Sequence, residues 1–156
     1  FEIKCFNGEK VYVAFALDSH DREVISFVAK KEPMFAEDIQ SLMIKCVEKR
    51  FNKLHTPHPI EWLSDRGSIY RAIETKNIAN NLGLKSCYTM AYSPESNGMA
   101  EAFVNTIKRD YVYVNDCVDA ETVLKMLSNW FEDYNGVAPH SALGMLSPLQ
   151  YLKKIS

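Results

Sequence analysis

The first 31 residues most constrain what this chain can fold into. Three short apolar stretches, at 1–6, 11–17 and 23–29, are separated by the turn sequences "NGEK" and "DSHDR". Asn-Gly is the strongest short signal for a hairpin turn, and alternating β-branched and aromatic residues suit strands. The opening segment therefore predicts an antiparallel meander of three strands.

The period of the apolar residues changes over residues 36–51. Apolar side chains recur there at helical spacing, at Ile39, Leu42, Met43, Cys46, Val47 and Phe51. The pattern predicts an amphipathic helix whose other side, with Lys45, Lys49 and Arg50, faces solvent.

Strands and helices alternate through the rest of the chain. Strands are expected at 60–63 and 85–92, and helices at 72–84, 99–113, 119–134 and from the Ser147-Pro148 pair onward. This order predicts an α/β fold with one mixed five-stranded sheet, three antiparallel strands followed by parallel strands, and helices on both faces. We expect a single domain over residues 1–156.

Composition excludes some classes of protein. A chain of 156 residues with 47% hydrophobic and 24% charged residues is typical of a globular domain, and no apolar run approaches the roughly 18 residues that span a bilayer. Four scattered cysteines without a CxxC pair argue against a zinc ribbon and favour a reduced, cytoplasmic setting. The net charge of −2 gives no overall attraction to DNA, so DNA contacts must come from local patches or from other parts of the protein.

Two carboxylates occupy positions where α/β enzymes place active groups. Asp65 follows the apolar run at 60–63, and active residues gather at strand ends in such sheets. Glu101 lies near the start of the helix expected at 99–113, where it shares one stripe with Asn105 and Lys108. Taken singly, Glu101 would only complement the helix dipole and Asp65 would be a turn residue.

The spacing of the two acids is a further signal that they belong to one site, since 35 residues lie between Asp65 and Glu101. With "WLSDRGSIY", "YSPESNGMAEAFVNTIKRD" and "YNGVAPHSALGMLSPLQYL", essentially the whole chain resembles the integrase-like (DDE) transposases of bacterial insertion sequences. It is most similar to the insertion sequence two branch of the IS-three group, and retroviral integrases are more distant relatives. The resemblance implies an RNase H-like fold.

The resemblance also implies roles for particular residues. Asp65 and Glu101 would be catalytic and would hold Mg²⁺, with two ions expected and Mn²⁺ possible, because Mg²⁺ prefers carboxylate oxygens. Contacts to DNA would come from Lys108, Asn105, Arg109 and Arg66.

The activity implied is that of a polynucleotidyl transferase in transposition, which cleaves a DNA strand and transfers its 3′-OH to another strand. The implied partners are transposon ends, target DNA and further copies of the chain, in the bacterial cytoplasm at the nucleoid. A separate N-terminal helical region would recognise the terminal repeats and supply most of the affinity for DNA.

The family has a third acid, on the opening strand, and residues 1–6 contain no Asp. By resemblance this Asp is expected immediately before Phe1, so we expect the fragment without it to be inactive. Asp18 and Glu2 are alternatives within the chain, although turn chemistry better explains Asp18 and an exposed strand position better explains Glu2. Arg66 departs from the family, which more often has Asn there, and would either contact a phosphate or displace a hydrogen bond.

Other polar and aromatic residues receive simpler interpretations. The loop "HTPHP" with His55 and His58 lacks further zinc ligands, and His140 is a structural or DNA-facing residue rather than a metal ligand. Glu95 is a weaker candidate than Glu101 because it lies in a loop. The remaining aromatics considered, Trp62, Trp130, Phe131 and Tyr134, are expected in the core or in an interface.

Two alternatives to a transposase core stay open. One keeps the fold but makes it an RNase H-like nuclease of junctions or hybrids, and the 35-residue spacing with "SPESNG" argues against it. The other is a remnant that binds DNA or oligomerises without catalysis.

Overall fold

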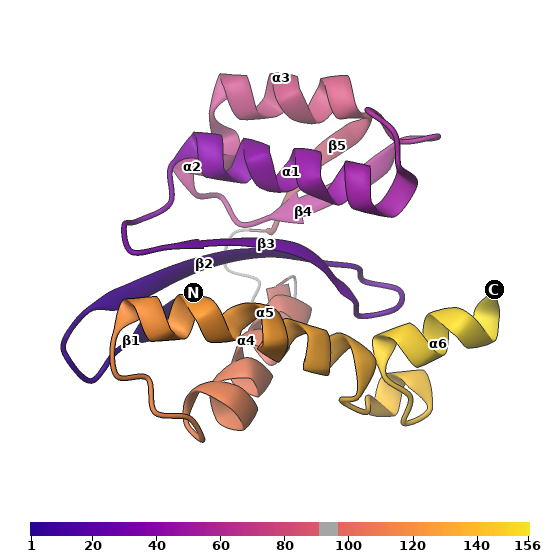
Figure 1. The fold of residues 1–156 in the computed structure, drawn as a ribbon. Helices are drawn as coiled ribbons and strands as arrows, with labels where there is room; N and C mark the ends of the chain where they lie inside the picture. The colour runs from indigo at the N-terminus through magenta and orange to yellow at the C-terminus, as the bar shows by residue number, and fades with distance from the viewer. Residues whose placement is uncertain (91–96) are drawn as a thin grey trace.

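A three-stranded antiparallel sheet forms the middle layer of the fold (Figure 1). In the computed structural model, which describes residues 1–90 and 97–156, the sheet consists of β1 (Glu2–Lys4), β2 (Lys10–Leu17) and β3 (Val24–Lys30). The first hairpin turns at Gly8, whose φ of 90° suits a residue without a side chain. The predicted meander is confirmed.

The second sheet consists of two parallel strands, β4 (Ile60–Ser64) and β5 (Leu84–Tyr88). The expected single five-stranded sheet is therefore corrected: among the described residues, hydrogen bonds join the strands into a three-stranded and a two-stranded sheet. The reason lies in β1, which is only three residues long and pairs with β2, while an open cleft separates its start from the residues after β4. The α/β class stands.

Helices lie on both sides of the three-stranded sheet, as predicted. Figure 1 shows α1 (Ala36–Phe51) and α3 (Ile73–Leu82) on one side and α4 (Gly98–Ile107) and α5 (Ala120–Gly136) on the other. The shorter elements are α2 (Ser68–Arg71), the π-helix η2 (Lys108–Val112), the 3₁₀-helix η3 (Ser141–Leu143) and α6 (Pro148–Ile155). Within the described ranges, no helix combines the length and the apolar character needed to cross a membrane.

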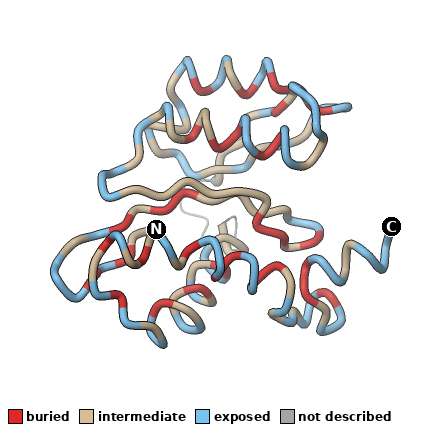
Figure 2. The backbone as a smooth tube through the Cα atoms, in the orientation of Figure 1, coloured by how far each residue is buried: buried red, intermediate tan, exposed pale blue. Residues whose placement is uncertain are grey.

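Two hydrophobic cores result, one on each side of the sheet. The first joins β1 and β2 to α4 and α5, and includes Phe103, Ile107 and Phe131. The second joins β2 to α1, α3, β4 and α2, and includes Met43 and Trp62. Figure 2 shows the buried positions repeating along the helices of both layers.

Helix ends follow the sequence signals closely. α1 has the predicted bounds and ends at Asn52, whose φ of 52° is left-handed. α3 ends at Gly83, where φ is 86° and a side chain would collide with Thr56. The hydroxyl of Ser147 accepts a hydrogen bond from the Gln150 amide, which confirms the predicted N-cap of α6.

The helix expected at 99–113 is shorter and changes form. The α-helical part ends at Ile107, and residues 108–112 form one π-helical turn in which the Tyr113 amide donates to the Lys108 carbonyl at 2.9 Å. Single π-turns inside helices frequently occur at functional sites, and this one begins at a candidate DNA-binding residue.

Arg50 was expected in solvent and instead joins an ionic cluster. Its guanidinium donates to Asp18 at 3.2 Å, to Asp21 at 3.2 Å and to Glu23 at 2.6 Å. Asp18 also accepts a bond of 2.8 Å from the His20 amide, which confirms its interpretation as a turn residue. Three acids in the turn between β2 and β3 thus fix the end of α1, a pairing that helical periodicity alone does not show.

Candidate active site

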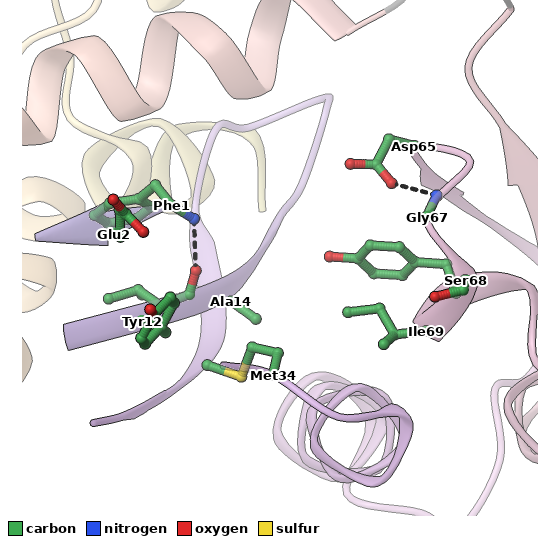
Figure 3. A pocket seen from close by; sticks show the side chains of 11 residues that line it. Phe1, Glu2, Tyr12, Ala14, Met34, Asp65, Gly67, Ser68 and Ile69 are labelled. Atoms are coloured by element: carbon green, nitrogen blue, oxygen red, sulfur yellow. Dashed lines mark hydrogen bonds between the residues drawn. The ribbon is translucent and has the colours of Figure 1, made fainter. Parts of the chain in front are cut away.

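Asp65 lies directly after the last residue of β4, in an exposed turn. Its Oδ1 accepts a hydrogen bond of 2.7 Å from the Gly67 amide. A Cβ at position 67 would lie 2.9 Å from this same oxygen, closer than such atoms normally approach. Glycine therefore lets the carboxylate fold back onto the turn, and Figure 3 shows the second oxygen turned toward an open cleft.

The cleft separates Asp65 from the start of β1 and has a volume of about 490 Å³. In Figure 3, Asp65, Gly67, Ser68 and Ile69 border one side, and the other side is formed by Phe1, Glu2, Tyr12 and Ala14, with Met34. The end of β4 and the beginning of β1 thus face one another, although no ladder joins these two strands among the described residues.

The pKa of the Phe1 amino group reflects the charged side chains that act on the start of β1. Burial lowers the pKa of the Phe1 amino group, the positive charge of Lys108 lowers it further, and the Asp65 carboxylate acts in the opposite direction. Lys108 and Asp65 therefore both lie within electrostatic reach of the start of β1. Burial also raises the pKa of Tyr70, and the charge of Asp65 adds to that shift.

Glu101 lies in the first turn of α4 and is exposed. The opposite side of α4 is buried through Phe103 and Ile107, so the helix presents Glu101 and Asn105 to solvent as the predicted stripe requires. Phe103 fixes this orientation, since its ring centroid lies 4.5 Å from that of Phe15 on β2.

The two candidate acids come from different layers of the molecule. Asp65 follows a strand that packs in the second core, whereas Glu101 belongs to a helix that packs in the first. Within residues 1–90 and 97–156, no three His, Cys, Asp or Glu side chains lie close enough together to hold a metal ion. The structure thus places Asp65 beside the cleft and Glu101 in the first turn of α4, and their meeting at a metal stays a prediction.

The two candidate arginines have partners within the chain. Nε of Arg66 donates to the Thr89 carbonyl at 3.1 Å, which ties the turn after β4 to the end of β5. Arg109 makes two bonds to Asp110, of 2.7 and 3.0 Å, on the exposed surface. Arg109 would have to leave this pair to contact DNA, which makes it the weaker candidate of the two.

Of the remaining sequence candidates, only Glu2 borders this site among the described residues. Glu2 lines the cleft and forms an ion pair of 3.3 Å with Lys10. His55 and His58 are exposed, as expected for a surface loop. The aromatics assigned to the core are buried at Trp130, Phe131 and Tyr134 and half-buried at Trp62. Glu95 lies outside the described residues.

His140 is half-buried and packs against α5. Its ring packs edge-to-face on Tyr134 at 5.0 Å, and Nε2 is buried without a hydrogen-bond partner among the described residues. Burial lowers the pKa of His140, and the positive charge of Arg22 lowers it further. The folded protein therefore favours the neutral imidazole.

A pH-dependent stability follows from His140. An unfolded histidine takes up its proton near pH ~6.5, and the folded protein resists the same proton until a lower pH. The unfolded state thus binds more protons as the pH falls, so stability present above pH ~6.5 is lost below it. In urea titrations between pH 8 and 5, we expect His140→Phe, which keeps the ring contact, to lose less stability than the wild type. Parallel curves for both proteins would contradict this assignment.

Two contributors to the site were not predicted from the sequence. The amide of Gly67 donates to Asp65, and Tyr70 on the short helix α2 lines the same cleft as Asp65. The signal for Gly67 was present, because Asp followed two residues later by Gly is typical of a side-chain turn. The four-residue α2 gave no periodic signal of its own.

Comparison with other sequences identifies similar proteins. Two family models, both described as integrase core domain, match residues 1–94 and 82–148. The chain is 46% identical over 153 residues to an insertion element IS136 uncharacterized protein of Agrobacterium fabrum, covering 97% of this chain and 78% of that protein. It is 47% identical over 154 residues to the transposase InsD for insertion element IS2A/D/F/H/I/K of Escherichia coli, covering 99% of this chain and 51% of that protein. The chain thus spans about half the length of this InsD transposase.

Solved structures with the same fold are more distant in sequence. A chain of the simian T-cell lymphotropic virus intasome in complex with PP2A regulatory subunit B56 gamma superposes with a TM-score of 0.71 at 18% identity, covering 97% of this chain and 51% of that one. The Mos1 transposase catalytic domain with raltegravir and Mg gives 0.66 at 20% identity, covering 84% and 67%. These likenesses establish an α/β fold of the RNase H-like kind.

Proposed function

This chain belongs to the integrase core family, as the catalytic core of a transposase like that of insertion sequence two, and we propose that Asp65 and Glu101 form its metal-dependent site for DNA strand cleavage and strand transfer. The observation that carries the proposal is the position of Asp65. It directly follows β4, its carboxylate accepts a hydrogen bond from the Gly67 amide, and it lines the cleft opposite the start of β1.

The donor atoms of the two candidate acids are of the kind that binds Mg²⁺. Asp65 keeps one oxygen turned to the cleft and Glu101 is exposed, and both provide the carboxylate oxygens that Mg²⁺ prefers. The third acid of the family is expected on the opening strand, and Phe1 at the start of that strand lines the same cleft as Asp65. The similar Mos1 domain, which was solved with Mg, supports a divalent ion, and we propose two.

Bound metal would neutralise the phosphate oxygens and favour an oxygen nucleophile, and the protein residues would orient the strand. We propose that the ammonium of Lys108 pairs with a phosphate next to the scissile bond, together with Asn105, which is exposed one turn earlier on the same stripe. Water would serve as the nucleophile for cleavage and a 3′-hydroxyl for joining, and both steps are in-line displacements at phosphorus.

Other features of the proposed protein lie beyond this chain. The InsD transposase it resembles is about twice as long, so recognition of the terminal repeats is assigned to another part of the protein. We propose transposon ends and target DNA as substrates, a homo-oligomer as the active form, and the bacterial cytoplasm as the place of action.

The test is strand cleavage and joining of labelled transposon-end DNA by the natural chain that carries these residues and the preceding Asp. We expect nicked and joined products with Mg²⁺ or Mn²⁺ and none after chelation. Products from RNA–DNA hybrids or four-way junctions, with none from transposon ends, would favour the alternative of an RNase H-like nuclease. DNA binding without any product would favour a non-catalytic remnant.

Gly67→Ala should lower this activity without unfolding the protein. The added Cβ meets only a movable side-chain oxygen at close range, so the Asp65 carboxylate has to turn away while the backbone, at φ −59°, stays unstrained. Displacing a group that orients a metal ligand typically costs 10–100-fold in activity or metal affinity. We expect about a tenfold loss of cleavage, a higher Mg²⁺ requirement and an unchanged melting temperature.

The matched control is Gly136→Ala at the end of α5, where an added Cβ has open space around it. This variant should cleave like the wild type. Full activity of Gly67→Ala at limiting Mg²⁺ would show that the turn does not orient Asp65.

A further inference from the structure

A second groove, which shares no lining residue with the cleft at Phe1, runs between α3 and β5. Its lining mixes polar and apolar residues and includes two lysines but no carboxylate. It consists of Pro59, Lys76, Asn77, Asn80, Gly83, Leu84, Lys85, Ser86 and Tyr88. We call it the β5 groove. The chain has a net charge of −2, so a concave surface that carries two lysines and no acid differs from the rest of the molecule in charge. Such a surface favours an anionic ligand.

The cations of the β5 groove are available for a ligand. Lys76 and Lys85 are exposed, and in the described part of the chain neither forms an ion pair. Lys76 instead lies over the ring of Tyr88, 5.7 Å from its centroid. The nearest acid in the sheet is Glu61, which stands beside Lys85 in the parallel register and does not line the groove.

The groove leads to the proposed active site. Tyr88 is paired with Ser64 in the parallel ladder, and Asp65 is the next residue after Ser64. Arg66 connects the turn that holds Asp65 to the end of β5, because its side chain donates a hydrogen bond to the carbonyl of Thr89, the residue after Tyr88. Arg66 therefore provides a positive charge near the end of the groove closest to Asp65, and Lys76 and Lys85 provide two more along the groove.

The length of the groove suits a strand of nucleic acid. β5 has five residues, and four steps of about 3.3 Å give roughly 13 Å. This equals about four base steps of duplex DNA at 3.4 Å each. The exposed amides of Asn77 and Asn80 lie on α3 one turn apart, about 5–6 Å, and can donate to phosphate oxygens along the same path.

We propose that the β5 groove binds the sugar–phosphate backbone of the DNA strand that continues past the scissile phosphate. The inference rests on the proposed function, because that function places the scissile phosphate at Asp65. The groove contributes affinity and register but reads no bases, since its cations and amides face a backbone whose chemistry is the same for every sequence. Both DNA that flanks the element and target DNA have this chemistry.

The test compares Lys76→Gln/Lys85→Gln with Lys153→Gln/Lys154→Gln on α6, which removes the same charge from another exposed surface. Binding is measured by fluorescence anisotropy of the natural full chain, at several salt concentrations and with Ca²⁺ to prevent cleavage. One duplex carries the element end with flanking DNA and the other has unrelated sequence. Thermal melts confirm that both variants are folded.

We expect the groove variant to bind roughly ten- to fiftyfold more weakly at 0.1 M salt, and the slope of log K against log salt to fall by about two. The control variant should keep the wild-type slope. A loss confined to the element-end duplex assigns the groove to flanking DNA, and a loss with the unrelated duplex assigns it to target DNA. Either result supports the proposal.

Equal binding by the groove variant and the control, with both duplexes, overturns the proposal. If the wild type still cleaves DNA in that case, the proposed function stands and only the groove is wrong. If the wild type neither binds nor cleaves DNA with metal present, the proposed function itself is wrong, and the proposal for the groove fails with it.

Discussion

Asp65→Asn and Glu101→Gln should each reduce strand cleavage and strand joining at least about 10³-fold. An amide keeps the shape of the carboxylate but loses the negative charge that holds a divalent metal, and metal-dependent phosphoryl transfer depends on that charge. Both side chains are exposed, so neither substitution creates a cavity or an unpaired buried charge. The measurement is gel separation of nicked and joined products in Mg²⁺ and in Mn²⁺.

Two controls make the result specific. Glu132→Gln on α5 removes an exposed acid distant in the chain from both sites and should leave the rates unchanged. Glu2→Gln tests the one cleft acid that we exclude as a catalytic group, since Glu2 is paired with Lys10, and it should lose at most a few-fold. Full activity in folded Asp65→Asn or Glu101→Gln would place the chemistry elsewhere.

Phe103→Ala should cost about 3–5 kcal/mol of unfolding free energy, the range for truncating a large aromatic side chain in a core. The ring is 2% exposed and is surrounded by other rings, with centroids 4.5 Å away at Phe15, 5.0 Å at Tyr134 and 5.9 Å at Phe131. Removing it leaves a cavity between β2, α4 and α5. Urea denaturation followed by circular dichroism gives the loss directly.

The comparison for Phe103 is Phe6→Ala, because Phe6 is 71% exposed in the turn after β1. This variant should change stability by no more than about 0.5 kcal/mol. A loss below ~1.5 kcal/mol in Phe103→Ala would mean that the neighbouring rings collapse into the space. In that case α4 would not depend on Phe103 for its orientation.

Much of the fold could be predicted from local pattern. The bounds of α1, the stop at Gly83 and the cap at Ser147 follow from chemistry within a few residues of each boundary. The division into two sheets could not be predicted, because it depends on how far β1 extends and on which of its edges finds a partner. The same holds for Arg50, whose three acidic partners lie 27 to 32 positions away in the chain.

The candidate site was predicted to a different degree. Asp65 and Glu101 emerged from spacing and resemblance, and the structure confirms that one follows a strand and the other begins a helix. The π-turn at Lys108 was not predicted, because a single wider turn leaves the apolar periodicity almost unchanged. The groove beside β5 also needed the structure, since it combines residues from a helix and a strand that carry no shared motif.

The two cores have a consequence for how this molecule responds to heat and to distant substitutions. Asp65 follows a strand that packs in one core, and Glu101 belongs to a helix that packs in the other. Strand β2 contributes to both cores, with Val13 in one and Ala14 in the other. The distance between Asp65 and Glu101 therefore depends on how the two cores pack against β2. Weaker packing in either core, far from any DNA contact, should misalign the two acids before the protein unfolds. Catalysis should then decline at temperatures where circular dichroism still reports a native fold.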